Sequence, residues 1–159
     1  MNSSRRQMMK GTGGAAVLGL AMAAGLFRPR SAWAQQGAWN KQAFETKSVA
    51  DTLKALGGGQ PIESKDVTIT SPDIAENGAV VPFTIASKVP NTQNIALLIE
   101  KNPNILAANF SIPEGTDAWV NTRVKMAQTS NVIALVKGGD GKFYYASKEV
   151  KVTLGGCGG

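Results

Sequence analysis

The sequence predicts a mainly β protein: an Ig-like antiparallel β-sandwich of about seven strands with an N-terminal helix and a flexible C-terminal Gly-Gly-Cys-Gly-Gly arm. Two observations predict this fold. From residue 66 onward, short alternating or continuous apolar runs are separated by turn signals every 8–12 residues or so. The only cysteine is Cys157, so no internal disulfide can form, and the inter-sheet disulfide of antibody domains is absent.

The chain divides into three parts. Residues 1–34 have the pattern of an export signal, residues 35–154 that of one sandwich domain with its helix, and residues 155–159 form the arm. Without the first 34 of its 159 residues the chain keeps 125, which is enough for one domain with a hydrophobic core.

The N-terminus carries a twin-arginine signal. Arg5-Arg6 precedes an apolar, Gly- and Ala-rich stretch over residues 11–27, and Ala32-Trp33-Ala34 is a small-x-small cleavage site. A transmembrane anchor is the alternative, but 17 weakly apolar residues are at the short edge of what spans a bilayer. We therefore expect the twin-arginine pathway to export the folded protein to the periplasm, where the mature chain is soluble.

The positive charge of the sequence belongs to this signal. The whole chain has 17 Lys and Arg against 11 Asp and Glu. Five of the basic residues and none of the acidic ones lie within residues 1–34, so the mature chain has 12 against 11, a net charge of +1. Nucleic-acid binding requires a basic surface, and the mature chain offers no electrostatic case for it.

A helix is predicted over residues 38–57. Ser48 can cap it, with Asp51 three residues on as a weak capping box. One apolar face comprises Val49, Leu53 and Leu56. Gly57-Gly58-Gly59 ends the helix. We expect it to pack on the edge of the domain; a partner-binding helix is the alternative.

Seven strands are predicted, over residues 66–70, 80–86, 95–99, 105–110, 118–128, 131–136 and 143–154. Residues 95–99 form a continuous apolar run, which is typical of a buried central strand. Pro82 cannot donate a ladder hydrogen bond and predicts an edge or bulge position. Asn77-Gly78 predicts a turn, because both residues tolerate a positive φ. Gly-rich residues 138–141 predict the last hairpin turn.

The final strand leads directly into the arm. In it Val150, Val152 and Leu154 alternate with polar neighbours, so we expect these three side chains to anchor the strand in the core. Four glycines surround the single thiol, namely Gly155, Gly156, Gly158 and Gly159. Glycine has no Cβ to restrict the backbone, and three residues span up to about 10 Å, so Cys157 is predicted to be mounted on a mobile, exposed tether.

Most catalytic arrangements are excluded by composition. The chain has no histidine, which excludes Cys-His and Ser-His-Asp catalysis, C-x-x-C-H haem attachment and zinc sites of the Cys/His kind. Four carboxylates lie in predicted turns, where a solvated surface role is expected: Asp73, Glu76, Asp117 and Asp140. Trp39 and Trp119 are expected in the core or at an interface. No metal or cofactor is predicted.

The C-terminus carries a family resemblance. Gly-Gly-Cys-Gly-Gly after residues 150–154 resembles the sulfur-carrier Y subunit of the bacterial Sox thiosulfate-oxidising system. The twin-arginine signal and the stretch Ala75-Glu76-Asn77-Gly78 after Pro72-Asp73 are also similar to that family. The terminal motif together with an export signal is highly specific.

The resemblance implies a covalent carrier and not an enzyme. It implies that Cys157 holds thiosulfate-derived sulfur and that the four glycines provide clearance and reach. It also implies a heterodimer with a small all-β Z subunit. Transient contacts are implied with a haem-containing sulfur transferase, a sulfate-releasing hydrolase and a sulfane dehydrogenase.

Three alternatives remain beside this interpretation. The first is an exported Ig-like binding module whose Cys157 only forms an intermolecular disulfide, although such a module has no use for four glycines. The second is a ubiquitin-like sulfur carrier with a C-terminal thiocarboxylate, against which the export signal argues. The third is a thiol enzyme, which the lack of histidine disfavours.

Overall fold

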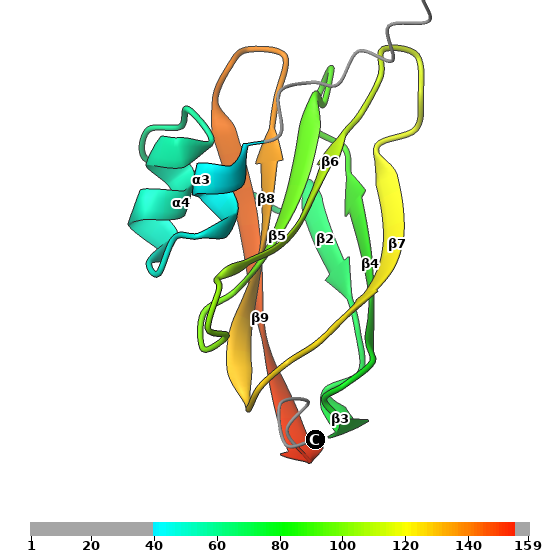
Figure 1. Cartoon of the computed structure of the whole chain (residues 1–159). Coiled ribbons are helices and arrows are strands. Elements are labelled where there is room, and N and C mark those ends of the chain that lie inside the picture. Colours follow the sequence, from blue (N-terminus) through cyan, green and yellow to red (C-terminus); the bar gives the residue numbers. More distant parts are fainter. Residues whose placement is uncertain (1–39, 155–159) are drawn as a thin grey trace, which may run out of the picture. The chain divides into compact units, whose positions relative to one another are not determined.

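The computed structural model describes residues 40–154, which form two β-sheets packed face to face and two short helices (Figure 1). The helices are α3 (Lys41–Phe44) and α4 (Val49–Ala55). The strands are β1 (Ile62–Glu63), β2 (Val67–Thr70), β3 (Ile74–Asn77), β4 (Val81–Ser87), β5 (Asn94–Ile99), β6 (Leu106–Ser111), β7 (Trp119–Val124), β8 (Ser130–Lys137) and β9 (Phe143–Leu154). The predicted mainly β sandwich is confirmed, with β1 and β3 added to the seven expected strands.

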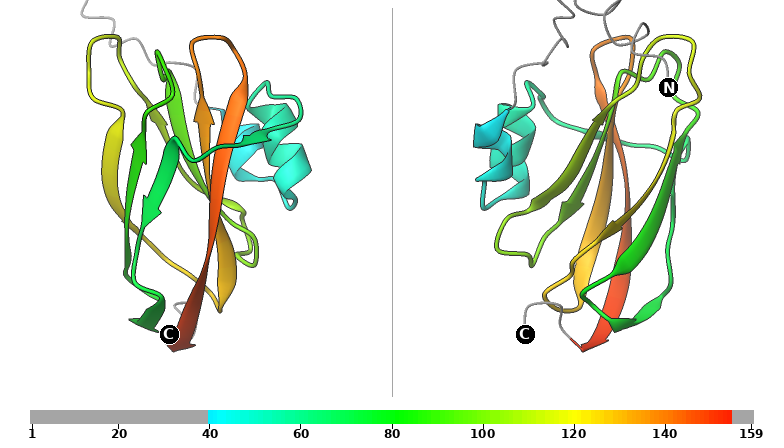
Figure 2. Two further views of the ribbon diagram at one scale, coloured as in Figure 1. Left: turned by 180° about the vertical axis from the view of Figure 1, so that it is seen from behind. Right: turned by 45° about the vertical axis from the view of Figure 1, so that its right-hand side comes forward.

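The two sheets differ in size. The larger has the order β1-β9-β8-β5-β6, with β3 also paired to β9, and the smaller has the order β2-β4-β7. β1 and β3 run parallel to β9, whereas all other pairs are antiparallel. The helices lie on the outer face of the larger sheet, on the side away from the smaller one (Figure 2). No helix among residues 40–154 is long and apolar enough to cross a membrane.

The main core fills the space between the sheets. Alternate side chains of the long strands point into it, as the period of two in a β-strand requires. Its fully buried members include Phe83 and Ile85 from β4, Ile95, Leu97 and Ile99 from β5, and Val132 and Val136 from β8. The predicted burial of residues 95–99 is confirmed, because β5 lies between β8 and β6 and all five side chains are buried.

A second apolar cluster fixes the helices to the sheet. Leu53 of α4 packs with residues that point outward from the larger sheet, among them Leu98, Leu135 and Phe143. The cap predicted at Ser48 is confirmed, since its side chain accepts a hydrogen bond from the Asp51 amide. The single helix predicted over residues 38–57 is wrong within the described part of the chain: Phe44 ends α3, and residues 45–48 are not helical.

Pro82 does not lie on an edge strand. Its strand β4 is the central one of the smaller sheet. The Ser87 amide donates to the Ala118 carbonyl, so the odd-numbered residues of β4 exchange hydrogen bonds with β7 and Pro82 faces the β2 side. Pairing with β2 ends at Thr84, so no partner strand needs the missing N–H of Pro82.

Candidate functional site

The predicted carrier residues all follow β9. Cys157 and its flanking glycines Gly155, Gly156, Gly158 and Gly159 lie outside the described residues, as does Trp39. The structure does describe the point from which this segment leaves the domain. β9 has the bounds that the alternating pattern predicted, and it ends at Leu154. We call its last four residues, 151–154, the arm root.

The arm root is held by a different strand from the rest of β9. Pairing of β9 with β8 ends at Val150, opposite Ser130. Beyond that point β3 takes over on the other edge, with parallel register positions Ile74↔Lys151, Ala75↔Val152 and Asn77↔Leu154. On the β8 side, the Val152 amide donates to the Thr129 hydroxyl at 2.9 Å.

Hydrogen bonds fasten the two ends of this short ladder. At one end the Lys151 amide donates to the Asp73 carbonyl at 2.9 Å, and at the other the Gly78 amide donates to the Leu154 carbonyl at 2.7 Å. Between them the Thr153 hydroxyl donates to the Glu76 carbonyl at 2.9 Å. We call residues 73–78 the β3 latch.

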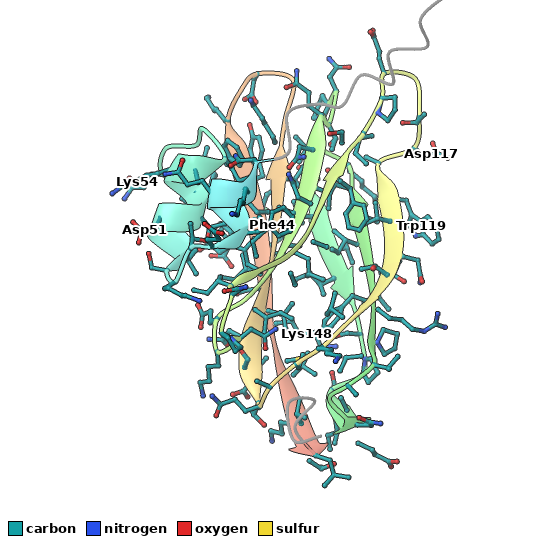
Figure 3. All side chains as sticks on the ribbon, in the orientation of Figure 1. Phe44, Asp51, Lys54, Asp117, Trp119 and Lys148 are labelled. Atoms are coloured by element: carbon teal, nitrogen blue, oxygen red, sulfur yellow. The ribbon has the colours of Figure 1, made fainter. Side chains whose placement is uncertain are left out.

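Lys148 connects the latch to the body of β9. It lies opposite Val132, on the face of β9 that lines the core, and its side chain is 29% exposed. The ammonium group reaches the edge of the sandwich, where it donates to the Ser71 carbonyl at 2.7 Å and pairs with the Asp73 carboxylate at 2.8 Å. Figure 3 shows Lys148 in the half of the molecule that contains β3. The hydrogen bond from Lys148 and its charge lower the pKa of Asp73, so the ion pair persists to a more acidic pH than an ordinary aspartate would allow.

No sequence pattern predicted this latch. Residues 76–78 were predicted to be a turn based on the positive φ that Asn-Gly tolerates, but neither Asn77 nor Gly78 has a positive φ. Instead, the Asn77 side chain accepts from the Ala79 amide at 2.8 Å, and the chain turns after β3. Four residues paired with a strand more than seventy residues later leave no periodic signal in the sequence.

The prediction for Leu154 was also wrong. Val150 is fully buried and Val152 packs against the core, but the Leu154 side chain is 69% exposed. The end of β9 is held by backbone hydrogen bonds to the latch and not by burial of the Leu154 side chain. Two more large apolar side chains are exposed in the neighbouring latch and turn: Ile74 at 57% and Val80 at 56%. Among residues 40–154 the exposed large apolar side chains are these three, here called the arm-root patch, together with Ile62 and Trp119. Ile74 lies opposite Lys151, whereas Leu154 continues the alternation of Val150 and Val152, so these two side chains point to opposite faces of the β3–β9 ladder.

Trp119 is not a core residue. It is 56% exposed and points away from β7 (Figure 3), so the expectation of a core position is wrong, while its role at an interface stays a prediction. The carboxylates of Asp73, Glu76, Asp117 and Asp140 are on the surface, as predicted. Within residues 40–154, no group of three carboxylate, thiol or imidazole side chains could hold a metal ion.

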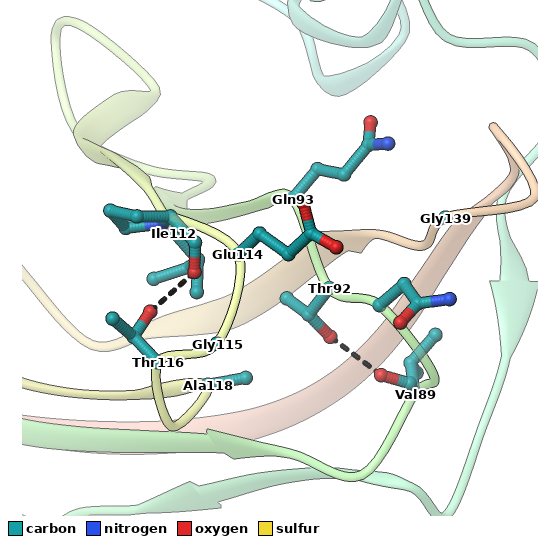
Figure 4. Close-up of a pocket in the computed structure, with 11 residues that line it drawn as sticks. Val89, Thr92, Gln93, Ile112, Glu114, Gly115, Thr116, Ala118 and Gly139 are labelled. Carbon is teal, nitrogen blue, oxygen red and sulfur yellow. Dashed lines mark hydrogen bonds between the residues drawn. The ribbon is translucent and has the colours of Figure 1, made fainter.

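A cavity of about 460 Å³ lies at the opposite end of the sandwich from the arm root (Figure 4). The loops before β5 and before β7 line it, together with Gly139. Its buried hydroxyl, that of Thr92, donates to the Val89 carbonyl at 2.8 Å, so this group is already satisfied. The cavity shows no set of groups prepared for catalysis, and its Gly139 lies before the start of β9, at the other end of that strand from Leu154.

Comparisons with known proteins show the family of this chain. Residues 53–157 match the family model of the sulfur oxidation protein SoxY. Among solved structures, the sulfur carrier protein SoxY from Chlorobium limicola f thiosulfatophilum is 39% identical with a TM-score of 0.61, covering 67% of this chain and 97% of that one. A superoxide reductase (neelaredoxin) from Ignicoccus hospitalis is 18% identical with a TM-score of 0.48, covering 54% of this chain and 79% of that one. No curated protein matches the chain in sequence.

Proposed function

Because this chain belongs to the SoxY family of sulfur oxidation proteins, we propose that it is a periplasmic carrier that holds thiosulfate-derived sulfur on Cys157. The observation that best supports this proposal is the extent of the family match, which runs through the latch and the arm root to Cys157 itself. A carrier has to present its cargo to several enzymes, and one thiol beyond the end of a fastened strand suits that task.

The proposed chemistry begins with an oxidation. The Cys157 thiol and thiosulfate form an S–S bond, releasing one proton and passing two electrons to the haem of a separate enzyme. The product is an S-thiosulfonate on the cysteine. Water then cleaves the terminal sulfonate as sulfate in a second enzyme and leaves a persulfide on Cys157. A sulfane dehydrogenase then removes six electrons from the outer sulfur of the persulfide, which takes three oxygen atoms from water and becomes an S-sulfonate. A further hydrolysis cleaves the S–S bond, releases this sulfur as sulfate and regenerates the thiol.

The described residues contribute position and not catalysis. The latch holds residues 151–154 on the sheet, so the chain that bears Cys157 begins at the end of the sandwich. The exposed apolar side chains of the arm-root patch lie on both faces of the ladder at which the described part of β9 ends. We propose that the enzymes which receive the arm dock on Ile74, Val80 and Leu154.

The proposal includes a partner and a compartment. A small all-β Z subunit would form a heterodimer with this chain and be exported with it, and the twin-arginine signal over residues 1–34 would direct both to the periplasm. The partner subunit needs no signal of its own, because this pathway transports folded proteins.

Mass spectrometry of the intact periplasmic protein tests the carrier role. Protein from cells oxidising thiosulfate should carry sulfur or thiosulfate adducts on Cys157 that reductant removes. Cys157→Ser should remove both the adducts and sulfur turnover and leave the far-UV circular dichroism unchanged, because the described helices and strands are held by two apolar clusters within residues 40–154. A bare thiol or a simple disulfide dimer in these cells would favour the binding-module alternative.

A matched pair of variants tests the docking role of the patch. Ile74→Lys places a charge on the arm-root patch, whereas Ile62→Lys places one on β1, which pairs with the opposite end of β9 at Tyr144. We expect I74K to raise the KM of the sulfate-releasing enzyme for the loaded carrier several-fold and I62K to leave it unchanged. Equal KM values in the two variants would contradict docking on this patch.

A further inference from the structure

We propose that the β3 latch sets the length of the carrier arm, and that its opening lengthens the arm by the four residues of the arm root. This inference rests on the proposed function, because it concerns how far Cys157 can move from the sandwich. It follows from the exchange of partners along β9: strand pairing with β8 ends at Val150, and beyond that point β3 and one hydrogen bond from the Val152 amide to the Thr129 hydroxyl hold the strand.

The change in reach is large compared with the arm itself. With the latch closed, three steps separate Leu154 from Cys157, which span up to about 10 Å. With the latch open and the hydrogen bond from Val152 to Thr129 released, the last fastened residue is Val150, and seven steps span up to about 25 Å. An opening that leaves both sheets intact would therefore more than double the distance that the thiol can cover.

The latch is built to be weaker than the rest of the sheet. Its ladder is four residues long, and only Ala75 among residues 74–77 is buried. Ile74, at one end of the ladder, and Leu154, at the other, are mostly exposed. Local opening free energies are small where few apolar contacts are buried, whereas the β8–β9 ladder is covered on both faces.

Two polar groups at the start of the latch set its balance. Lys148 stabilises the closed form, because its ammonium group holds the Ser71 carbonyl and the Asp73 carboxylate. The Ser71 hydroxyl favours the open form, because it is buried and has no hydrogen-bond partner among the described residues. Opening returns this hydroxyl to water and recovers its hydrogen bonds.

Amide hydrogen exchange tests the latch directly. The reporters are the amides of Lys151 and Gly78, whose acceptors lie across the ladder from them. Lys148→Met keeps the long apolar stem and removes the charge, so it should speed exchange at both amides about three- to ten-fold. Asp73→Asn should act in the same direction. Ser71→Ala, which removes the unpartnered hydroxyl, should slow exchange at the same amides.

The control is a second lysine–aspartate pair. Lys142→Met breaks the contact of Lys142 with Asp140, which is at the other end of β9, and should leave both reporter amides unchanged. Unchanged exchange in K148M and D73N, or an equal rise across the β9 residues paired with β8, would overturn the proposal, because the arm root would then not open as a separate unit.

A nitroxide on Cys157, the only thiol, tests the effect on reach. In K148M its paramagnetic broadening should extend to amides farther from Leu154 than in the wild type. An insertion of four residues after Leu154 serves as the positive control and should extend it similarly. Faster amide exchange without wider paramagnetic broadening would overturn the proposal that latch opening lengthens the arm. Neither readout needs a sulfur substrate, so missing adducts on Cys157 would contradict the proposed function without touching the latch.

Discussion

The three glycines that follow α4 should respond differently to alanine. In sequence Gly57, Gly58 and Gly59 are equivalent, but the structure separates them. Gly57 has a φ of +77°, and the amides of Gly57 and Gly58 donate to the carbonyls of Lys54 and Leu53. These bonds form a Schellman motif, which requires the left-handed conformation at Gly57.

The expected changes in unfolding free energy follow from the surroundings of each glycine. A Cβ at Gly57 meets no atom within 4 Å, so Gly57→Ala costs only the left-handed conformation, about 1–2 kcal/mol. A Cβ at Gly58 lies 2.9 Å from two ring carbons of Phe143, a buried side chain, so overpacking costs about 1–3 kcal/mol. Gly59 has neither constraint, and Gly59→Ala should stabilise by about 0.4–1 kcal/mol by restricting the unfolded chain.

Equilibrium urea unfolding followed by far-UV circular dichroism measures these differences. Gly59→Ala is the matched control, since it makes the same chemical change one residue away from the constrained pair. The m-values should agree among the variants, because the surface exposed on unfolding is the same. Equal midpoints for all three variants, or a G58A variant as stable as G59A, would refute the assigned left-handed turn and the packing of Gly58 on Phe143.

Two further predictions concern polar contacts. The Tyr144 hydroxyl donates to the Asp140 carboxylate at 2.8 Å, and this hydrogen bond raises the pKa of Tyr144 above 10.0. The stabilising effect of the contact is therefore lost as the pH rises through that raised value. Ultraviolet titration in a Tyr145→Phe background should show a lower pKa for Tyr144 after Asp140→Asn, and an unchanged pKa would contradict this contact. Ser48→Ala removes the side-chain cap of α4 and should lower the free energy of unfolding by about 1 kcal/mol in urea, whereas Ser48→Asp, which can still cap, should retain most of it.

Local patterns in the sequence predicted those parts of the structure that depend on neighbouring residues. Alternation predicted β9 with its bounds, an unbroken apolar run predicted the buried β5, and Ser48 with Asp51 predicted the start of α4. In each case the residues that carry the pattern lie in the predicted element or next to it. The resemblance carried by the last five residues predicted the family, which the comparisons confirm.

Contacts between distant segments produced the errors. Pro82 indicated an edge, but β4 is central and its partner β2 simply ends before reaching it. Leu154 continued the apolar alternation of its strand, but pairing with β8 has ended at Val150, and the Leu154 side chain is exposed. A side-chain pattern records which residues are apolar, not how far the neighbouring strand extends.

By itself the sequence determined that this protein is mainly β and has one thiol, at residue 157, because composition and local periodicity are properties of the chain alone. Only the tertiary structure decided what holds the strand that precedes this thiol in sequence. The arm root pairs with β3, and Lys148 of β9 pairs with Asp73 just before β3. These two segments are more than seventy residues apart in sequence and meet only in the folded domain. Backbone hydrogen bonds between such segments depend on position in space, and almost any residue type can make them.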